Sequence, residues 1–509
     1  MENEENTLIT LNGELTVQQI TRSQNAAATW QHQNMNTRIH IHTLLLAALC
    51  ALVIPSALHA SNVGKRYPSE KHLMVDRVTG RTLTVLTASD FSDAKPYQTH
   101  DTWTSDGNWI IFRSTRDGSR NGQIFVVNEL TGDIVQLTDD SATNTGSINL
   151  SRKEMKLFYT RGGPRFFRPP PPVADGSAST ETPPPPPPAR PLEVVELNIG
   201  ALLKDSMAGT LAKDPASYER IVATLPSDMR DGGGLALDSD ESCLYWSVNY
   251  AKPDDTAAAR QAQASAARDS RGARQIDNRN TDPAEAREAA RQRFAEAGKG
   301  EYGLYKIDIK TGALAKIIDV PFRVGHVQAN PWKPGEIIYC HETTGDADQR
   351  IWAVNADGTN NRPVYVETPD EWVTHETVSG PDELMFSIMG HLPYLREHPT
   401  GIAVINLRTK EMKLLGQVEE NMPNGTHGGF WHCNGSPDGK WAVGDTFLGS
   451  IYAINRATGE RTLLTTGHIM RPDHTHPIVS KDSKRVLIQS GMLTDGKALN
   501  LMTVALPQN

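Results

Sequence analysis

Histidines recur along the chain at one place relative to a repeated pattern of short strands. Five of seven repeats carry a histidine at or near the expected start of the first strand: His100, His326, His375, His432 and His476. His474 lies two residues before His476, so on a strand both side chains would point to the same face. Imidazole binds zinc, copper, iron and nickel, and manganese when oxygen atoms complete the shell. The spacing therefore predicts a metal site built from separate parts of the chain.

Two interpretations of these histidines remain open. In such repeats a histidine can be structural, tied to an aspartate of a turn; His100 and His432 fit that role and also fit contact with a substrate. For His326, His375 and the pair at 474 and 476 the functional interpretation is favoured, because packing alone does not explain a doublet beside other imidazoles directed to the same axis.

Short strands separated by tight turns must position these side chains. TSDGNWIIFRST from Thr104 and SPDGKWAVGDT from Ser436 open two similar units, and YGLYKIDIKTG from Tyr302 matches the second half of both. Four strands recurring at roughly 40–50 residues are typical of a β-propeller, in which the first strands of the units surround the axis. The first hairpin turns of seven units are expected at Ser105-Asp106, Arg152-Lys153, Ser239-Asp240, Pro334-Gly335, Pro381-Asp382, Pro437-Asp438 and Lys481-Asp482.

The chain is therefore predicted to be all-β, with a seven-bladed β-propeller over residues 61–509. The last unit ends one strand short, and Thr79 to Thr87 is expected to complete it, which hides sheet edges. The two units without a histidine carry Ser147 and Gly234 instead, which would leave one side of the channel mouth open for an extended substrate. Insertions are expected near 163–191, rich in proline, and near 253–300, partly helical.

Residues 1–60 are predicted to be a signal peptide or a single membrane anchor. Arg38, the apolar run from Leu44 to Ile54 and the small residues up to Ala60 follow the order of a secretory signal, and Met35 is a candidate for the true start. We expect a periplasmic or secreted protein without membrane contact beyond this segment. The net charge of −9 argues against a nucleic-acid partner, and the four cysteines form no CxxC motif.

The segments around the histidines resemble the oligogalacturonate lyases, a family of polysaccharide lyases with a seven-bladed propeller. The resemblance covers roughly Tyr302 to Met502 and, more weakly, the first blade. The segments that carry it are GHVQANPWKPGEIIYCHE from Gly325, RIWAVNADGTNNRPV from Arg350, THE from Thr374, WHCNGSPDGKWAVGD from Trp431 and DHTHP from Asp473.

This resemblance implies β-elimination on short α-1,4-linked galacturonides, with a divalent metal, usually manganese, held by three histidines and a glutamine. The motifs match His375, His474 and His476 to the ligand histidines, and they match His326 to a histidine beside the substrate.

The chain departs from the family pattern at two places. The position of the glutamine ligand holds Arg471, which leaves Asp473, Gln328 or water as the fourth ligand. The family's proposed base is an arginine shortly before the strand YGLYKIDIKTG, and here AGKGEYGLY has no arginine in register; Arg293 lies in the insertion.

Uronate elimination removes a proton next to a carboxylate, so charge builds on the carboxylate oxygens and a divalent cation stabilises it. We expect His326 to transfer a proton or position the substrate. Arg323, Arg350 and Arg471 are candidate clamps for carboxylates, or else solvated surface residues. The alternatives to an oligogalacturonide lyase are a non-catalytic periplasmic propeller of the TolB-like type and a lyase for another uronic-acid glycan.

Overall fold

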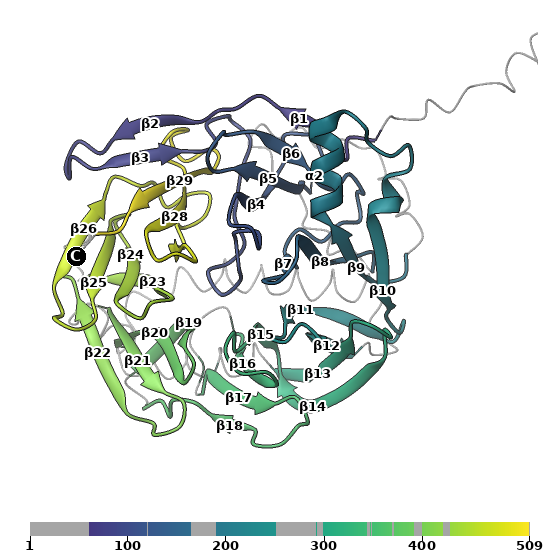
Figure 1. The fold of residues 1–509 in the computed structure, drawn as a ribbon. Coiled ribbons are helices and arrows are strands. Elements are labelled where there is room, and N and C mark those ends of the chain that lie inside the picture. The colour runs from purple at the N-terminus through teal and green to yellow at the C-terminus, as the bar shows by residue number, and fades with distance from the viewer. Residues whose placement is uncertain are drawn as a thin grey trace, which may run out of the picture. The chain divides into compact units, whose positions relative to one another are not determined.

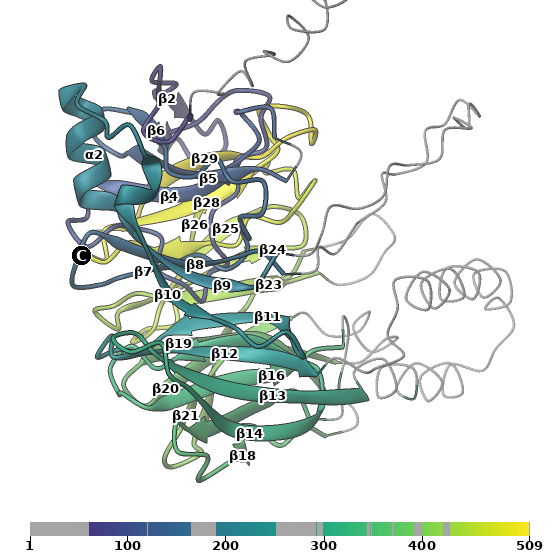
Figure 2. The same ribbon diagram turned by 90° about the vertical axis from the view of Figure 1, so that its right-hand side faces the viewer.

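Seven small antiparallel sheets surround a common axis in the computed structural model (Figures 1 and 2). The structure describes residues 61–119, 121–163, 190–250, 299–343, 349–368, 371–390, 400–420 and 428–507, together with Gln292 and Ala347. The prediction of a seven-bladed β-propeller is confirmed, and all seven expected hairpin turns fall between the first two strands of a blade.

The first three blades are formed by consecutive parts of the chain, with one strand recruited from upstream. Blade 1 contains β1 (Arg66–Tyr67), β6 (Ile134–Gln136), β5 (Gln123–Asn128) and β4 (Trp109–Ser114), and an isolated bridge from Trp103 to Ile110 extends it inward. Blade 2 contains β10 (Glu219–Thr224), β9 (Glu193–Asn198), β8 (Lys156–Arg161) and β7 (Asn149–Leu150). Blade 3 contains β11 (Met229–Leu237), β12 (Cys243–Tyr250), β13 (Lys299–Asp308) and β14 (Leu314–Phe322).

The next three blades each run from the axis to the rim in chain order. Blade 4 contains β15 (Val324–Ala329), β16 (Glu336–His341), β17 (Ile351–Asn355) and β18 (Arg362–Pro363). Blade 5 contains β19 (Glu371–Gly380), β20 (Glu383–Gly390), β21 (Gly401–Asn406) and β22 (Met412–Gln417). Blade 6 contains β23 (Phe430–Gly435), β24 (Trp441–Thr446), β25 (Ile451–Asn455) and β26 (Arg461–Thr465).

Blade 7 joins the two ends of the propeller, as the spare strand predicted. It contains β27 (Ile478–Val479), β28 (Arg485–Ser490), β29 (Asn500–Ala505), β3 (Thr82–Val85) and β2 (His72–Val75). β3 pairs with β29 through the partners Val85 with Met502 and Leu83 with Val504. The closing strand therefore comes from the expected segment, and β2 adds a fifth strand that the sequence did not predict.

The same side-chain contact stabilises the first turn of three blades. The hydroxyl of Thr104 donates to Asp106, that of Ser436 to Asp438 and that of Ser480 to Asp482, each over 2.6 Å. In each case the aspartate also accepts the backbone N–H two residues further along. Such local contacts favour a tight turn over a continued strand, which explains why these short motifs located the blades.

Large apolar side chains fill the space between neighbouring blades. In the cluster between blades 6 and 7, Leu83 and Val85 of the closing strand pack with Val443 and Val486. Because Leu83 is fully buried, we expect Leu83→Ala to lower the free energy of unfolding by about 2–5 kcal/mol. Urea denaturation measures this value. The control is Leu73→Ala on β2, where Leu73 is 68% exposed; it should change the free energy of unfolding by under about 0.5 kcal/mol. Equal losses in the two variants would contradict the packing of β3 between blades 6 and 7.

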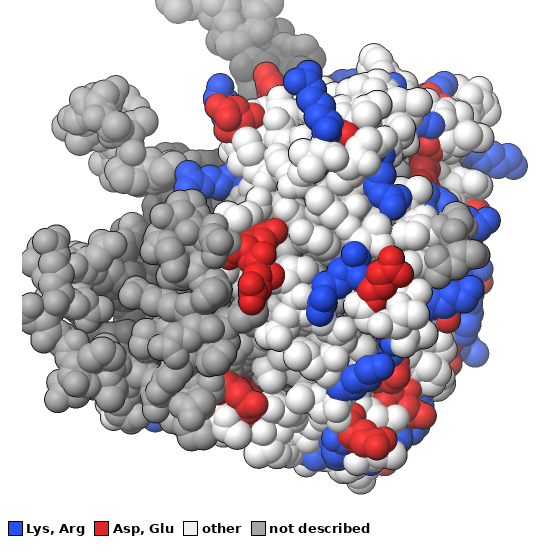
Figure 3. Space-filling view, turned by 90° about the vertical axis from the view of Figure 1, so that its left-hand side faces the viewer, with Lys and Arg blue, Asp and Glu red and all other residues white. Residues whose placement is uncertain are grey.

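Some of the sequence predictions concern residues that the structure does not describe, and one helix was not predicted. The signal or anchor segment at 1–60, the proline-rich stretch and nearly all of the 253–300 insertion lie outside them. The helix α2 (Ile199–Ala208), which follows β9, was not predicted; Asn198 caps its first turn and Gly209, with φ of 71°, ends it. Across the described ranges no helix is long and apolar enough to span a membrane. On the face in Figure 3, acidic and basic side chains are interspersed.

Candidate active site around the propeller axis

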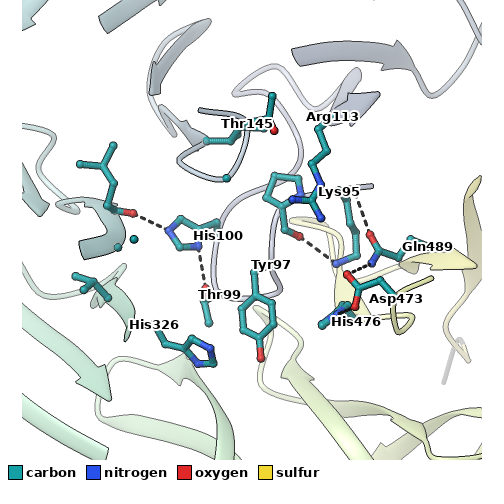
Figure 4. A pocket seen from close by; sticks show the side chains of 17 residues that line it. Lys95, Tyr97, Thr99, His100, Arg113, Thr145, His326, Asp473, His476 and Gln489 are labelled. Atoms are coloured by element: carbon teal, nitrogen blue, oxygen red, sulfur yellow. Dashed lines mark hydrogen bonds and ion pairs between the residues drawn. The ribbon is translucent and has the colours of Figure 1, made fainter. Parts of the chain in front are cut away.

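A cavity of about 210 Å³ lies where blades 1, 2, 3, 4 and 7 approach one another (Figure 4). Its polar lining consists of Lys95, Tyr97, Thr99, His100, Arg113, Thr145, His326, Asp473, His476 and Gln489. Gly146, Gly233 and Gly234 line another part of the wall. Gly234 thus borders the cavity, whereas the hydroxyl of Ser147 is bonded to the backbone of Asn144 and Thr160.

Irregular backbone places three histidines at the inner ends of the blades. The strand pairing shifts between Gly325 and Gln328, between Thr374 and Thr377, and between Phe430 and Cys433, so each shift encloses one histidine. Such β-bulges re-aim side chains and are frequent beside active sites.

The backbone φ angle is positive at His326 (44°), His375 (58°) and His476 (44°). This region is sparsely populated by residues other than glycine and costs about 1–3 kcal/mol per residue. Residues of this kind cluster at active sites and ligand-binding sites, which makes these three histidines candidates for the functional site.

His432 lies at the centre of the histidine cluster, defined here as His375, His432, His474 and His476. Its ring centroid is 4.0 Å from those of His375 and His476 and 5.3 Å from that of His474. Its Nδ1 lies 3.1 Å from both carboxylate oxygens of the buried Asp445. His432 is tied to an aspartate, as the structural interpretation expected, although Asp445 lies on β24 and not in a turn; it does not line the cavity.

The doublet 474–476 does not form a regular strand face. It precedes β27, and the hydroxyl of Thr475 and the N–H of His476 both donate to the side chain of Asp445 on β24 rather than to the backbone of a neighbouring strand. The ring centroids of His474 and His476 are 6.1 Å apart, and the indole N–H of Trp431 donates to Nδ1 of His474 over 2.8 Å.

Burial favours the neutral form of His375, His474 and His476. Burial, followed by the charge of His432, lowers the pKa of His375 well below its usual value and that of His476 to about 3. The pKa of His474 is lowered for the same two reasons. Neutral imidazole is the form that binds a metal, so these groups need lose no proton at neutral pH to act as ligands.

Imidazole nitrogens and a carboxylate are ligand types that a divalent cation binds. Nδ1 of His375 is 2.6 Å from the hydroxyl of Tyr97, while its Nε2 is buried without a hydrogen-bond partner. A buried polar atom of this kind is rare and calls for a ligand. Asp473, whose Oδ1 is 3.2 Å from Nε2 of His476, is the adjacent carboxylate, whereas the amide of Gln328 is occupied by the backbone of Glu376 and Val378.

In this structure the ring nitrogens of the histidine cluster do not point to one common position. In the described part of the chain, only His326, Cys340 and Glu342 present ligand atoms that all lie within 4.8 Å of one another. Nη2 of Arg350 lies 3.4 Å from His326 and 3.7 Å from Glu342, so a guanidinium already supplies the positive charge there. A cation held by the histidine cluster would therefore require its side chains to reorient.

His326 and His100 line the cavity on the side opposite His476 (Figure 4). Nδ1 of His326 is 3.0 Å from Glu376, and its ring centroid is 4.8 Å from that of Tyr97. Both ring nitrogens of His100 are occupied, one by the Thr99 hydroxyl and the other by the carbonyl of Leu235. Nε2 of His326 lies 3.6 Å from Glu342, so His326 borders the cavity with a carboxylate near each ring nitrogen, and His100 supports the wall.

None of the three arginines expected to clamp carboxylates lines the cavity. Arg350 is buried and paired with Glu376 at 3.2 Å and Glu342 at 3.7 Å, so it has a structural role. Arg323 and Arg471 are exposed and lie outside the lining. The cations that do face the cavity are Lys95 and Arg113, on the side of Asp473 and Gln489 (Figure 4). Sequence reasoning missed both, because neither belongs to a repeated motif.

Comparisons with known proteins find similarity to the oligogalacturonate lyases. A family model described as oligogalacturonate lyase matches residues 290–427, which include His326 and His375. The oligogalacturonate lyase of Dickeya dadantii is 28% identical over 216 residues, and the oligogalacturonide lyase of Pectobacterium atrosepticum is 28% identical over 214. These matches cover 38% of this chain, and the chain spans about half, 53%, of the length of either relative.

Solved structures extend the likeness to the whole propeller. A structure titled oligogalacturonate lyase in complex with manganese matches 88% of this chain and 99% of its own, with a TM-score of 0.62 and 21% identity. The oligogalacturonate lyase of Vibrio parahaemolyticus matches with the same coverage and TM-score at 20% identity. The resemblance to the oligogalacturonate lyases is confirmed. The segment matched by the family model contains two of the axial histidines.

Proposed function

We propose that this protein is a metal-dependent lyase that cleaves oligogalacturonides by β-elimination. The observation that carries the proposal is the close packing of the rings of His375, His432, His476 and Tyr97 beside a polar cavity on the propeller axis. The relatives named as oligogalacturonate or oligogalacturonide lyases and the neighbour titled as a manganese complex support the same activity.

His375 and His476, joined by His474 after its ring turns from Trp431, would hold the divalent cation, which we propose to be manganese. When bound, such a cation stabilises the negative charge that develops on a uronate carboxylate as the neighbouring C5 proton leaves. The chain's own groups bind and orient the sugar: Arg113 attracts a carboxylate, and His326 faces the substrate from the opposite wall. The glycine-lined side leaves room for a second sugar unit.

The activity is tested with purified protein, a divalent metal and a panel of short oligouronides. We expect absorbance in the ultraviolet band of unsaturated uronates to grow with trigalacturonide and to stay flat after chelation of the metal. Growth only with another uronate would identify a lyase for a different uronic-acid glycan. No growth with any substrate, in protein that carries stoichiometric metal, would reject the lyase and favour the non-catalytic propeller of the TolB-like type.

We also propose that the protein acts in the periplasm or outside the cell. The order of charged, apolar and small residues up to Ala60 supports export. Cell fractionation of the full chain tests this, and protein found only in the cytoplasm would contradict it.

A further inference from the structure

Tyr97 and Gln98 are neighbours in the irregular segment between β3 and β4, and each contacts one of the axial histidines. The hydroxyl of Tyr97 lies 2.6 Å from Nδ1 of His375, and Oε1 of Gln98 lies 3.0 Å from Nδ1 of His476. Figure 4 shows the ring of Tyr97 between His326 and His476, with centroids 4.8 Å and 5.0 Å away. Two adjacent residues thus meet the same ring nitrogen in two histidines from different blades.

Two contacts hold the backbone of this segment against blades 6 and 7. The side-chain amide of Asn434, on β23, donates to the carbonyl of Gln98 over 3.1 Å. The N–H of Lys95 donates to Oε1 of Gln489, on β28, also over 3.1 Å. The segment is therefore fixed by strands far from it in the sequence, and its side chains start from a defined position.

Packing alone does not explain Gln98. The residue is 1% exposed, and its Nε2 is buried without a hydrogen-bond partner in the described part of the chain. An unpaired buried amide group costs about 1–3 kcal/mol, so an apolar side chain of the same size would be more stable there. Its Oε1 can only accept a hydrogen bond, so Nδ1 of His476 donates to it.

The nitrogen that is already occupied decides which atom of each histidine can bind a metal. A neutral imidazole has one N–H and one lone pair, and a metal binds the lone pair. Because an oxygen contacts Nδ1 of both rings, Nε2 is left for the cation. Among the described residues, Nε2 of His375 is buried without a partner, and Nε2 of His476 faces Asp473 at 3.2 Å.

We propose that Tyr97 and Gln98 are positioning residues that leave Nε2 of His375 and His476 as the metal-binding atom, an inference that rests on the metal-dependent function proposed above. Each accepts the Nδ1 proton of one ring when metal is bound, which fixes the tautomer and the ring orientation. The backbone φ is positive at both histidines, 58° and 44°, so their sparsely populated conformation needs such contacts to persist.

Metal affinity, measured without turnover, tests this role. Titration of metal-free protein with Mn²⁺, followed by electron paramagnetic resonance, should give a Kd about 10–100-fold higher in Gln98→Met and in Tyr97→Phe than in the original chain. Gln98→Met keeps the volume but cannot accept from Nδ1. Gln98→Glu still accepts and should bind Mn²⁺ within about threefold of the original chain. If Gln98 served packing only, the buried carboxylate would be the more harmful of these two replacements.

Tyr67→Phe is the matched control. The Tyr67 hydroxyl donates to Gln136 over 2.8 Å at the rim of blade 1, so the variant removes one comparable hydrogen bond and should leave the Kd for Mn²⁺ unchanged.

A second measurement identifies the bound nitrogens directly. Zn²⁺ is diamagnetic and also binds imidazole, so ¹⁵N NMR of labelled histidines in the Zn²⁺ complex should show His375 and His476 protonated at Nδ1 and bound through Nε2. Binding through Nδ1 in either ring would overturn the proposal.

The outcomes separate this proposal from the lyase function. If Gln98→Met or Tyr97→Phe binds Mn²⁺ as tightly as the original chain, or Gln98→Glu is as weak as Gln98→Met, the proposal fails while the metal site and the lyase stand. If the original chain itself takes up no Mn²⁺, the metal-dependent function fails, and the positioning role fails with it.

Discussion

Replacing His474 and His476 together by alanine is expected to abolish metal binding and to lower lyase activity about 10³-fold. The reason is that a bound cation contributes several kcal/mol to the stabilisation of developing carboxylate charge, and each 1.4 kcal/mol corresponds to a factor of ten. Metal content by mass spectrometry and initial rates with trigalacturonide measure the two effects. The two single variants should differ from each other in metal content and in rate, because His474 is hydrogen-bonded to Trp431 and His476 lies beside Asp473.

His72→Ala provides the matched control for this experiment. His72 is exposed on β2, and its ring contacts only the carbonyl of Glu70 among the described hydrogen bonds. Its replacement should leave metal content and rate unchanged. If the double variant keeps one ion per chain, these two histidines are not the ligands, and the remaining imidazoles, His375 and His432, would have to be tested instead.

Glu376→Gln is expected to destabilise the fold by about 3–5 kcal/mol, the usual cost of leaving a buried charge without its partner. Glu376 is fully buried and accepts from Arg350 at 3.2 Å and lies 3.0 Å from His326. Removal of its charge leaves the buried Arg350 with Glu342 alone at 3.7 Å. The control Arg66→Met removes an exposed pair, at 3.0 Å from Asp133, and should cost at most about 1 kcal/mol.

The same substitution should also change the response to acid. Burial alone would raise the pKa of Glu376, but Arg350 and His326 outweigh it and lower the pKa from 4.5 to about 2. The stabilisation from its charge is therefore complete above pH 4.5 and is lost as the pH falls toward 2. Denaturant titrations across this range should show a smaller loss in Glu376→Gln than in the original chain; equal slopes would mean that the carboxylate is not held ionised by Arg350.

The architecture followed from local features of the sequence. Turns such as Thr104-x-Asp106 are specified by residues two positions apart, and each repeat signals its own blade regardless of the others. The spare strand at 79–87 was recognisable because one repeat lacked a partner. In contrast, β1 and β2 are short strands at the rim whose pairing depends on distant segments, and α2 depends on a cap rather than on a repeat.

The site was predictable only in part, because its geometry depends on contacts between blades. The repeat pattern placed the histidines near the axis, and it could not show that His432 lies between His375 and His476. Nor could it show that Arg350 forms an ion pair with Glu376 inside the fold. Lys95 stands in an irregular segment between β3 and β4, where no periodicity marks which side chain faces inward; only the assembled ring gives that residue its surroundings.

The seam between β3 and β29 makes completion of the ring depend on two segments far apart in the chain. Leu83 meets Val504 only after some four hundred intervening residues have been translated, and until then the edge of β3 that pairs with β29 has no neighbour. An unpaired edge invites association with another nascent chain. Ribosomal stalling or premature termination upstream of Asn500 should therefore yield aggregates rather than a six-bladed remnant, and quality control of this protein would act on the closing strand.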